Sequence, residues 1–308
     1  LQILPVQVEN AVNIVEAVPI WTGKANPRLR IRLESRFDTE KTGTLSCAGI
    51  TKEIQLKKGT NELVLDLGKL RKLSGSLVCS VRNPGKPGEE FRTEKTVNQT
   101  FYSMPMLPKQ GIRAVLPLPA SEWTSPKEKK SLLKATDCRP ELRIARDRNG
   151  IHVFAEITDD EFAQPYQQER MWLGDSLQLA FDVDASKEWD ANNQGFGFKG
   201  HRCFEFTVGL TGSGVQTYCH YAYDPVLKPG MVENVKASVT RKGNVTTYKV
   251  FFPWKAVGLQ EAPRTGSRFG FAAAVNDLDS GSRKALCLFQ GIVESKDPVR
   301  YGSLYLTE

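Results

Sequence analysis

Long apolar runs and low-complexity tracts are both missing from this chain of 308 residues. A helix needs a run of about 18 or more apolar residues to cross a bilayer, so we expect no membrane-spanning segment. Hydrophobic residues make up 40% of the sequence, which is enough for packed cores and argues against a disordered chain. The chain begins with Leu1 rather than methionine, and we interpret it as a processed product that has lost its signal peptide. These features predict an exported globular protein, secreted or held at the cell surface.

Recognisable catalytic motifs are also missing. The sequence has no nucleophile elbow, no HExxH motif and no glycine-rich loop of the phosphate-binding kind. Its acidic residues do not fall in a glycosidase motif, which would need two carboxylates facing each other across a cleft. We therefore predict no catalytic residue and a protein that is not an enzyme.

Cysteine and histidine offer no zinc site. The sequence has no CxxC pair, and its three histidines are not at zinc-ligand spacings. The six cysteines permit three disulfides, and Cys47 could bond Cys79 within the first third of the chain. The alternative is that the cysteines are free and buried, acting as small hydrophobic side chains.

A concentrated basic region is missing as well, although the formal net charge is +7. Residues 1–110 carry 17 Lys and Arg against 11 Asp and Glu, a net of +6, and residues 111–308 carry 25 against 24, a net of +1. Nucleic-acid-binding proteins usually cluster basic residues with aromatic residues on one face. We expect no nucleic-acid partner.

What is present in residues 1–107 is a series of short strands at regular spacing. Arg28–Leu33 alternates as RLRIRL, and turn signals such as Thr42-Gly43 separate it from its neighbours. About seven short strands punctuated in this way predict an immunoglobulin-like β-sandwich. A proline-punctuated connector follows, and we predict residues 108–112 to be the linker between two domains.

Residues 113–308 contain about ten further strands, which predict a second, larger antiparallel sandwich and make the chain all-β. Its most regular segment is Met171–Asp184, MWLGDSLQLAFDVD, where apolar and polar residues alternate. Strict alternation is typical of a half-buried strand. If that strand extended back to Trp172, its ring would share the polar face with Gln178. A ring beside polar groups is suited to stacking a sugar; the alternative is that Trp172 closes the end of the core.

Four segments of the second domain resemble, in their order, the family 9 carbohydrate-binding modules and their DOMON-like relatives. They are WLGDSLQLAFD, VTTYKVFFPWKAVGL, RFGFAAAVNDLDSG and DPVRYGSLYL. The second contains the Pro253-Trp254 step, and the last contains Asp297-Pro298 and Tyr301-Gly302. The resemblance covers residues 113–308 and implies a β-sandwich that binds a polysaccharide or oligosaccharide without catalysis.

The resemblance also implies a sugar site, with differences from the usual residues. Trp172 matches the first of two tryptophans that clamp the sugar in the best-known members. Gln178 stands where a glutamate is usual, and Glu205 stands near an expected arginine. The second tryptophan would fall near Ser295, so another ring must supply the second platform. The candidates for it are Phe289, Tyr301 and Tyr166.

Modules of this family often carry a structural calcium ion, which prefers several hard oxygen ligands. Two pairs of aspartates are candidates for it, Asp182 with Asp184 and Asp277 with Asp279. The alternative is that these carboxylates cap turns through their own backbone.

We therefore expect a non-catalytic, carbohydrate-binding part of a larger exported protein, with sugar stacked on Trp172. One alternative is a structural or protein-interaction sandwich that has lost the sugar site. Another is a haem-binding relative, whose axial ligands could be Met171 with His201 or His220.

Overall fold

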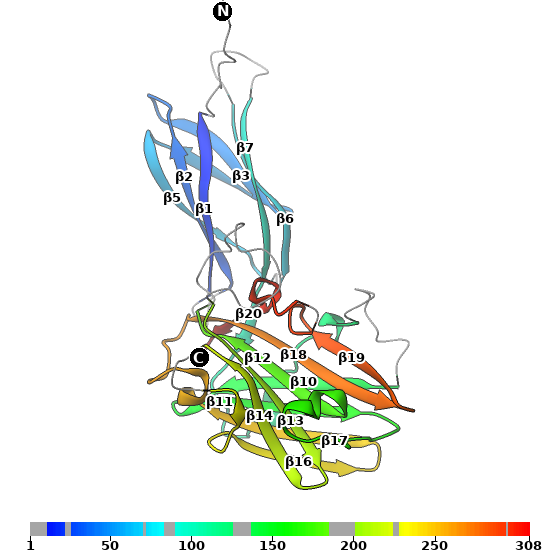
Figure 1. Ribbon diagram of the computed structural model, residues 1–308. Coiled ribbons are helices and arrows are strands. Elements are labelled where there is room, and N and C mark those ends of the chain that lie inside the picture. Colours follow the sequence, from blue (N-terminus) through cyan, green and yellow to red (C-terminus); the bar gives the residue numbers. More distant parts are fainter. Residues whose placement is uncertain are drawn as a thin grey trace, which may run out of the picture. The chain divides into compact units, whose positions relative to one another are not determined.

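The computed structural model describes residues 11–21, 26–69, 72–82, 90–125, 137–184, 201–223, 228–293 and 295–308. The described residues form strands with a few short helices, so the predicted all-β class is confirmed. The chain divides into two compact units, Leu1–Phe101 and Tyr102–Glu308, shown in Figure 1. No helix in the described part of the chain is long and apolar enough to cross a membrane.

The first unit has seven strands in its described residues, arranged in two antiparallel sheets. One sheet has the order β1 (Val12–Ile20), β2 (Arg28–Ser35) and β5 (Gly59–Asp66). The other has the order β4 (Ile50–Leu56), β3 (Lys41–Cys47), β6 (Lys72–Arg82) and β7 (Glu90–Thr100). The RLRIRL pattern of β2 buries Leu29, Ile31 and Leu33 completely, as alternation requires. The immunoglobulin-like assignment of this unit stays a prediction.

The second unit begins earlier in the sequence than the predicted linker. β8 (Tyr102–Met104) pairs in parallel with the C-terminal strand β20 (Gly302–Leu306). The side chains of Tyr102 and Met104 are buried in the core of the second unit. Residues 102–107, which the sequence assigned to the first domain, therefore belong to the second. The prolines after β8 suggested a stiff connector between two domains, but the backbone N–H of Leu107 donates to the carbonyl of Arg146 in the second unit.

Two sheets face each other across the core of the second unit. The small sheet has the order β10 (Arg139–Arg146), β11 (Gly150–Thr158), β17 (Val245–Pro253) and β16 (Lys236–Lys242). The large sheet has the order β15 (Gly230–Met231), β14 (Gly214–Ala222), β13 (Cys203–Thr211), β12 (Ser176–Asp182), β18 (Arg268–Asp279), β19 (Ser282–Leu288) and β9 (Trp123–Thr124), with β20 and β8 beside β18. Short 3-10 helices complete the unit: η1 (Ile112–Ala114), η2 (Ala120–Glu122), η3 (Gln168–Leu173), η5 (Trp254–Val257) and η6 (Pro298–Arg300).

The alternation predicted for β12 is confirmed in the core. Leu177, Leu179 and Phe181 point inward, and the ring of Phe181 packs edge-on against Phe252 of the small sheet at 5.2 Å between centroids. The prediction of a half-buried strand is wrong, because every residue of β12 is buried. Its outer face, which points away from the small sheet, is covered by residues that follow β19 in the sequence.

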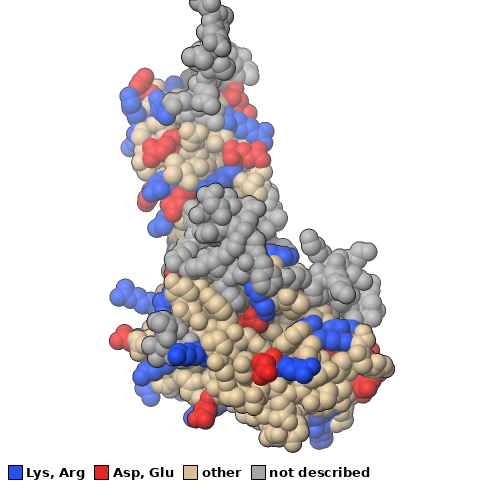
Figure 2. All heavy atoms as spheres, in the orientation of Figure 1, with Lys and Arg blue, Asp and Glu red and all other residues tan. Residues whose placement is uncertain are grey.

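The six cysteines are buried and free, so no disulfide joins them. On the view of Figure 2, basic and acidic residues are interspersed over the described surface of the first unit. This face carries no extended patch of one sign among the described residues.

Candidate functional site

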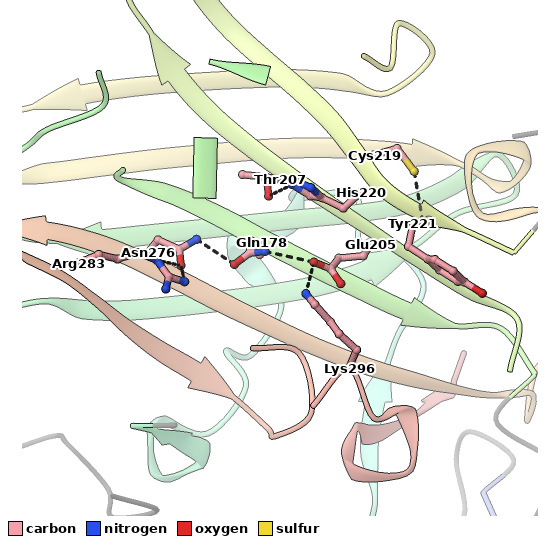
Figure 3. A network of polar contacts seen from close by, with 9 residues as sticks. All are labelled: Gln178, Glu205, Thr207, Cys219, His220, Tyr221, Asn276, Arg283 and Lys296. Atoms are coloured by element: carbon pink, nitrogen blue, oxygen red, sulfur yellow. Dashed lines mark hydrogen bonds and ion pairs between the residues drawn. The ribbon is translucent and has the colours of Figure 1, made fainter. Parts of the chain in front are cut away.

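A row of polar side chains crosses the outer face of the large sheet (Figure 3). Three neighbouring strands supply its centre, Asn276 from β18, Gln178 from β12 and Glu205 from β13. Strand alternation explains their position, because their sequence neighbours point into the core. These three side chains are almost completely buried, with exposed fractions of 1%, 4% and 2%.

Hydrogen bonds join these three side chains end to end. The amide of Asn276 donates to Gln178 Oε1 at 3.0 Å, and Gln178 Nε2 donates to Glu205 Oε1 at 3.2 Å. Both ends of the Gln178 amide are therefore used within the protein. Buried polar groups need such partners, because an unpaired one costs free energy.

Lys296 extends the row from the segment after β19. Its ammonium group contacts Glu205 Oε1 at 2.5 Å. Burial raises the pKa of Glu205, while the Lys296 cation acts in the opposite direction. The second carboxylate oxygen, Oε2, is buried and accepts no hydrogen bond from the described residues. Lys296 thus compensates the charge of Glu205 but leaves one of its oxygens unpaired.

Arg283 of β19 closes the opposite end of the row. Its Nε donates to Asn276 Oδ1 at 3.1 Å, and its guanidinium lies 4.7 Å from the centroid of the Trp172 ring. Trp172 is partly exposed. It lies in η3 rather than in an extension of β12, so the alternation of β12 does not determine which face its ring is on. The packing of η3 against the sheet brings its ring to the polar row.

A hydrogen-bonded side chain fixes η3 in this position. Gln164 Nε2 donates to the carbonyls of Met171 at 2.9 Å and Asp175 at 2.8 Å, on either side of Trp172. Gly174 allows this close approach, since a Cβ there would lie 2.5 Å from Gln164 Oε1. Gln164 therefore fixes the backbone on both sides of Trp172, which limits the positions that its ring can take.

The middle of the outer face is apolar and covered. Ala180, Ala272 and Ala274 form its floor, and Ile292 and Tyr301 pack on them. Tyr301 is therefore a buried packing residue, and Phe289 lies in the main core against Tyr102 at 5.3 Å. Neither ring offers the exposed second platform that the sequence suggested. Their burial comes from chain segments that the strand pattern could not place.

A histidine lies beside the polar row. Thr207 Oγ1 and His220 Nε2 are 2.8 Å apart, and the ring of Tyr218 contacts that of His220 at 5.0 Å between centroids. Burial, followed by the charge of Lys296, lowers the pKa of His220 to about 4. His220 is therefore neutral at neutral pH. Sequence reasoning missed it and Arg283 as parts of this face, although each has the outward parity of its strand.

A second cluster gathers aspartates at the end of β18. Asp159, Asp175 and Asp277 have carboxylate oxygens within 4.8 Å of one another, and Asp279 meets the same condition with Asp159 and Asp160. Asp159, Asp277 and Asp279 each have one buried carboxylate oxygen that accepts no hydrogen bond within the described part of the chain. Hard oxygens grouped in this way suit calcium.

The proximity of these aspartates changes their protonation. Burial raises the pKa of Asp277 to about 7, and the charge of Asp279 adds to the rise. Burial also raises the pKa of Asp175 to about 6, although two backbone N–H groups donate to it. Arg241 and Lys284 form ion pairs with Asp159 and Asp279, and protons or a further cation are needed to balance the remaining charge at neutral pH.

The other predicted pair of metal ligands is arranged differently. Asp182 Oδ2 contacts His201 Nδ1 at 2.8 Å, and Asp182 Oδ1 accepts the backbone N–H of Asp184 at 3.1 Å. The second contact is the turn-capping arrangement that was the alternative for these residues. Among the described residues, no acidic group joins Asp182 and Asp184 to form a metal-binding cluster.

Two solved structures resemble this chain. One is a family 9 carbohydrate-binding module from Caldicellulosiruptor kristjanssonii in complex with cellotriose, and the other is a family 9 carbohydrate-binding module from the same organism in complex with glucose. The first is 13% identical with a TM-score of 0.47, covering 68% of this chain and 94% of that one. The second is 14% identical with a TM-score of 0.46, covering 68% and 95%.

No curated protein matches the sequence. The sequence model described as carbohydrate family 9 binding domain-like matches residues 120–308, which is more than half of the chain. This match agrees with the resemblance read from the four sequence segments. The chain belongs to the carbohydrate family 9 binding domain-like family.

Proposed function

We propose that the second unit binds a polysaccharide or oligosaccharide at the outer face of the large sheet, where Trp172 meets the polar row. The observation that carries this proposal is the partly exposed Trp172, whose ring lies against Arg283, the residue that joins the polar row through its hydrogen bond to Asn276. An indole offers the CH-rich face of a sugar a stacking surface, and adjacent polar groups can bind its hydroxyls. Membership of a family of carbohydrate-binding domains supports the same function.

The structure differs from the expected site in two ways, and both limit where the sugar binds and which residues contact it. The segment that contains Ile292 and Tyr301 covers the middle of the face, so the sugar binds at the Trp172 end rather than across the whole sheet. The predicted roles of Gln178 and Glu205 become supporting ones, because both are buried and bonded within the protein. Their hydrogen bonds hold Asn276 and Lys296 in place.

Affinity electrophoresis of the whole chain tests this function. The chain is run in native gels with and without a dissolved polysaccharide, across a panel of neutral and acidic polymers. We expect at least one polymer to retard it relative to a non-binding protein of similar size. Equal mobility in every gel would contradict the proposal.

The covered middle of the face favours a second candidate, a sandwich that has lost its sugar site and serves as a structural or protein-interaction part. In that case no saccharide retards the chain. We further propose that the chain is a non-catalytic part of a larger exported protein, which its membership of a family of binding domains supports.

We also propose that Asp159, Asp175, Asp277 and Asp279 hold one calcium ion. Three unpaired buried carboxylate oxygens in this cluster support it, because such atoms are costly unless a cation or a donor satisfies them. The ion would neutralise the cluster and tie the end of β18 to the segment that follows β11. Asp182 and Asp184 have no part in this site.

A further inference from the structure

Arg283 carries a charge that the described residues do not balance. Its Nε and Nη2 both donate to the neutral amide oxygen of Asn276, and Nη1 has no hydrogen-bond partner among the described residues. None of the described carboxylates forms an ion pair with it. Burial lowers the pKa of Arg283, as expected for a partly desolvated cation. A buried or half-buried charge of this kind is normally paired, so a missing anion is a physical indication of a ligand.

The rest of the face does not supply that anion. Glu205 is the acidic group within the row, and it is 2% exposed and paired with Lys296. His220 is neutral, because burial lowers its pKa to about 4. Glu169, whose charge acts on His220, is exposed and lies in η3. The end of the row at Trp172 is thus positive.

A guanidinium matches one ligand group better than others. Its planar set of N–H donors fits the two oxygens of a carboxylate, whereas a sugar hydroxyl accepts only one of them well. The indole ring of Trp172 lies directly against this guanidinium, so a pyranose in contact with the ring has its substituents within reach of Nη1.

We propose that the saccharide bound at this face is acidic, a chain containing uronic acid residues, and that Arg283 is the residue that sets this specificity. This inference rests on the proposed carbohydrate-binding function. Arg283 recognises the carboxylate, and Trp172 provides the sugar contact that neutral and acidic chains share.

Two trisaccharides with the same backbone provide the test. Cellotriose and the corresponding β-1,4-linked glucuronic acid trisaccharide differ at C6, where the second carries carboxylates. Titration calorimetry of the whole chain at low salt should give an affinity for the acidic trisaccharide about tenfold higher, the size of one charge-assisted pair. Raising the salt concentration should reduce the difference, since exposed charges are screened.

Variants separate the specificity from the binding function. Arg283→Gln should bring the two affinities within about twofold of each other, which corresponds to the loss of most of that pair. Arg283→Lys should keep part of the preference, because the charge remains and the planar donor set is lost. Arg139→Gln removes an exposed arginine from the small sheet and should leave both affinities unchanged. Thermal melts of each variant establish that it is folded.

Each other outcome has a definite meaning. Equal binding of both trisaccharides to the unmodified chain, or an unchanged preference in folded Arg283→Gln, would overturn the specificity and leave the carbohydrate-binding function standing. Failure of both trisaccharides and of every polymer in the electrophoresis panel would overturn the function and this inference together.

Discussion

At the residue scale, Trp172 can have a binding role or a packing role, and one substitution distinguishes them. Trp172→Ala should lower the affinity for a bound saccharide by about 2 kcal/mol, the size of an interface hot spot. The melting temperature should change little, because Trp172 is only partly buried and lies in η3, outside the two sheets. Tyr223, 45% exposed in the same unit, gives the control Tyr223→Ala. A lower melting temperature with unchanged affinity would show that the ring only packs.

The pair formed by Lys296 and Glu205 makes a second prediction at this scale. Lys296→Met should cost about 3 kcal/mol of unfolding free energy near neutral pH, because it leaves a buried carboxylate without its cation. The pKa of Glu205 is already raised by burial and should rise further in this variant. A raised carboxyl pKa stabilises the folded state at low pH and destabilises it as the pH rises through that pKa.

Denaturant unfolding at several pH values measures this effect. Lys296→Met should recover stability as the pH falls, and the double variant Lys296→Met, Glu205→Gln should recover most of it at every pH. If the single variant were equally stable at pH 5 and pH 8, the charge of Glu205 would not be the cause.

Several site residues could be predicted from the sequence, and the reason others could not is physical. Gln178 was identified because β12 alternates regularly, and the structure places it with Glu205. Phe289 follows β19 and Tyr301 precedes β20, and sequence alone could not decide whether their rings face the core or the solvent. Parity could assign Arg283 to this face but could not show its role, because that role depends on Trp172, which is 111 positions earlier in the chain.

At the element scale, the aspartate cluster links the end of β18 to the segment after β11, and calcium should stabilise that link. Thermal melts at pH 8 should shift to a higher temperature with calcium than with a chelator, since an ion that binds only the folded state raises its stability. Asp277→Asn should reduce the shift. A melting temperature at pH 8 indifferent to both calcium and chelator would exclude the site.

The same cluster predicts a pH dependence without calcium. The pKa values of Asp175, about 6, and Asp277, about 7, are raised above those of unfolded aspartate. Such groups stabilise the folded state at low pH and lose that contribution as the pH rises through about 6 to 7. In chelator, therefore, the contribution of this cluster should raise the melting temperature at pH 5.5 relative to pH 8, and Asp277→Asn should weaken that difference. If the melting temperature of Asp277→Asn changed between pH 5.5 and pH 8 as much as that of the unmodified chain, this prediction would be contradicted.

Elements whose burial depends on neighbours near in sequence were predicted best. The alternation of β2 and of β12 gave the correct inward residues in both units. The cover over the outer face of β12 could not be predicted, because Ile292 and Tyr301 come from more than 100 residues later. Strand periodicity shows which side chains share a face but not what packs on that face.

At the scale of the whole molecule, the sequence predicted two all-β units and the structure has them. The predicted boundary between them lies too late in the sequence, because it leaves β8 in the first unit. Tyr102-Ser103-Met104 is too short to read as a strand, and the prolines that follow suggested a linker. Its partner β20 is at the opposite end of the chain, so local pattern could not reveal the pairing.

This boundary gives the last prediction, which compares two fragments. Residues 102–308 should fold alone, with the melting temperature of the second unit in the whole chain, because they contain every strand of its two sheets. Residues 113–308 lack β8 and should be less stable by about 4 kcal/mol or more, the cost of removing two large buried side chains. Those side chains are Tyr102 and Met104, at 6% and 0% exposure.

Backbone and side-chain bonds add to that cost. Without β8, the backbone N–H of Thr307 loses its acceptor on Met104, and Glu122 loses the hydroxyl of Tyr102, which donates to it at 3.0 Å. Restoring residues 102–112 with Tyr102→Ala and Met104→Ala should recover the β8 pairing but only part of the stability, which separates the backbone from the side-chain contribution. Equal melting temperatures for 113–308 and 102–308 would show that β8 is dispensable and that the unit begins where the prolines end.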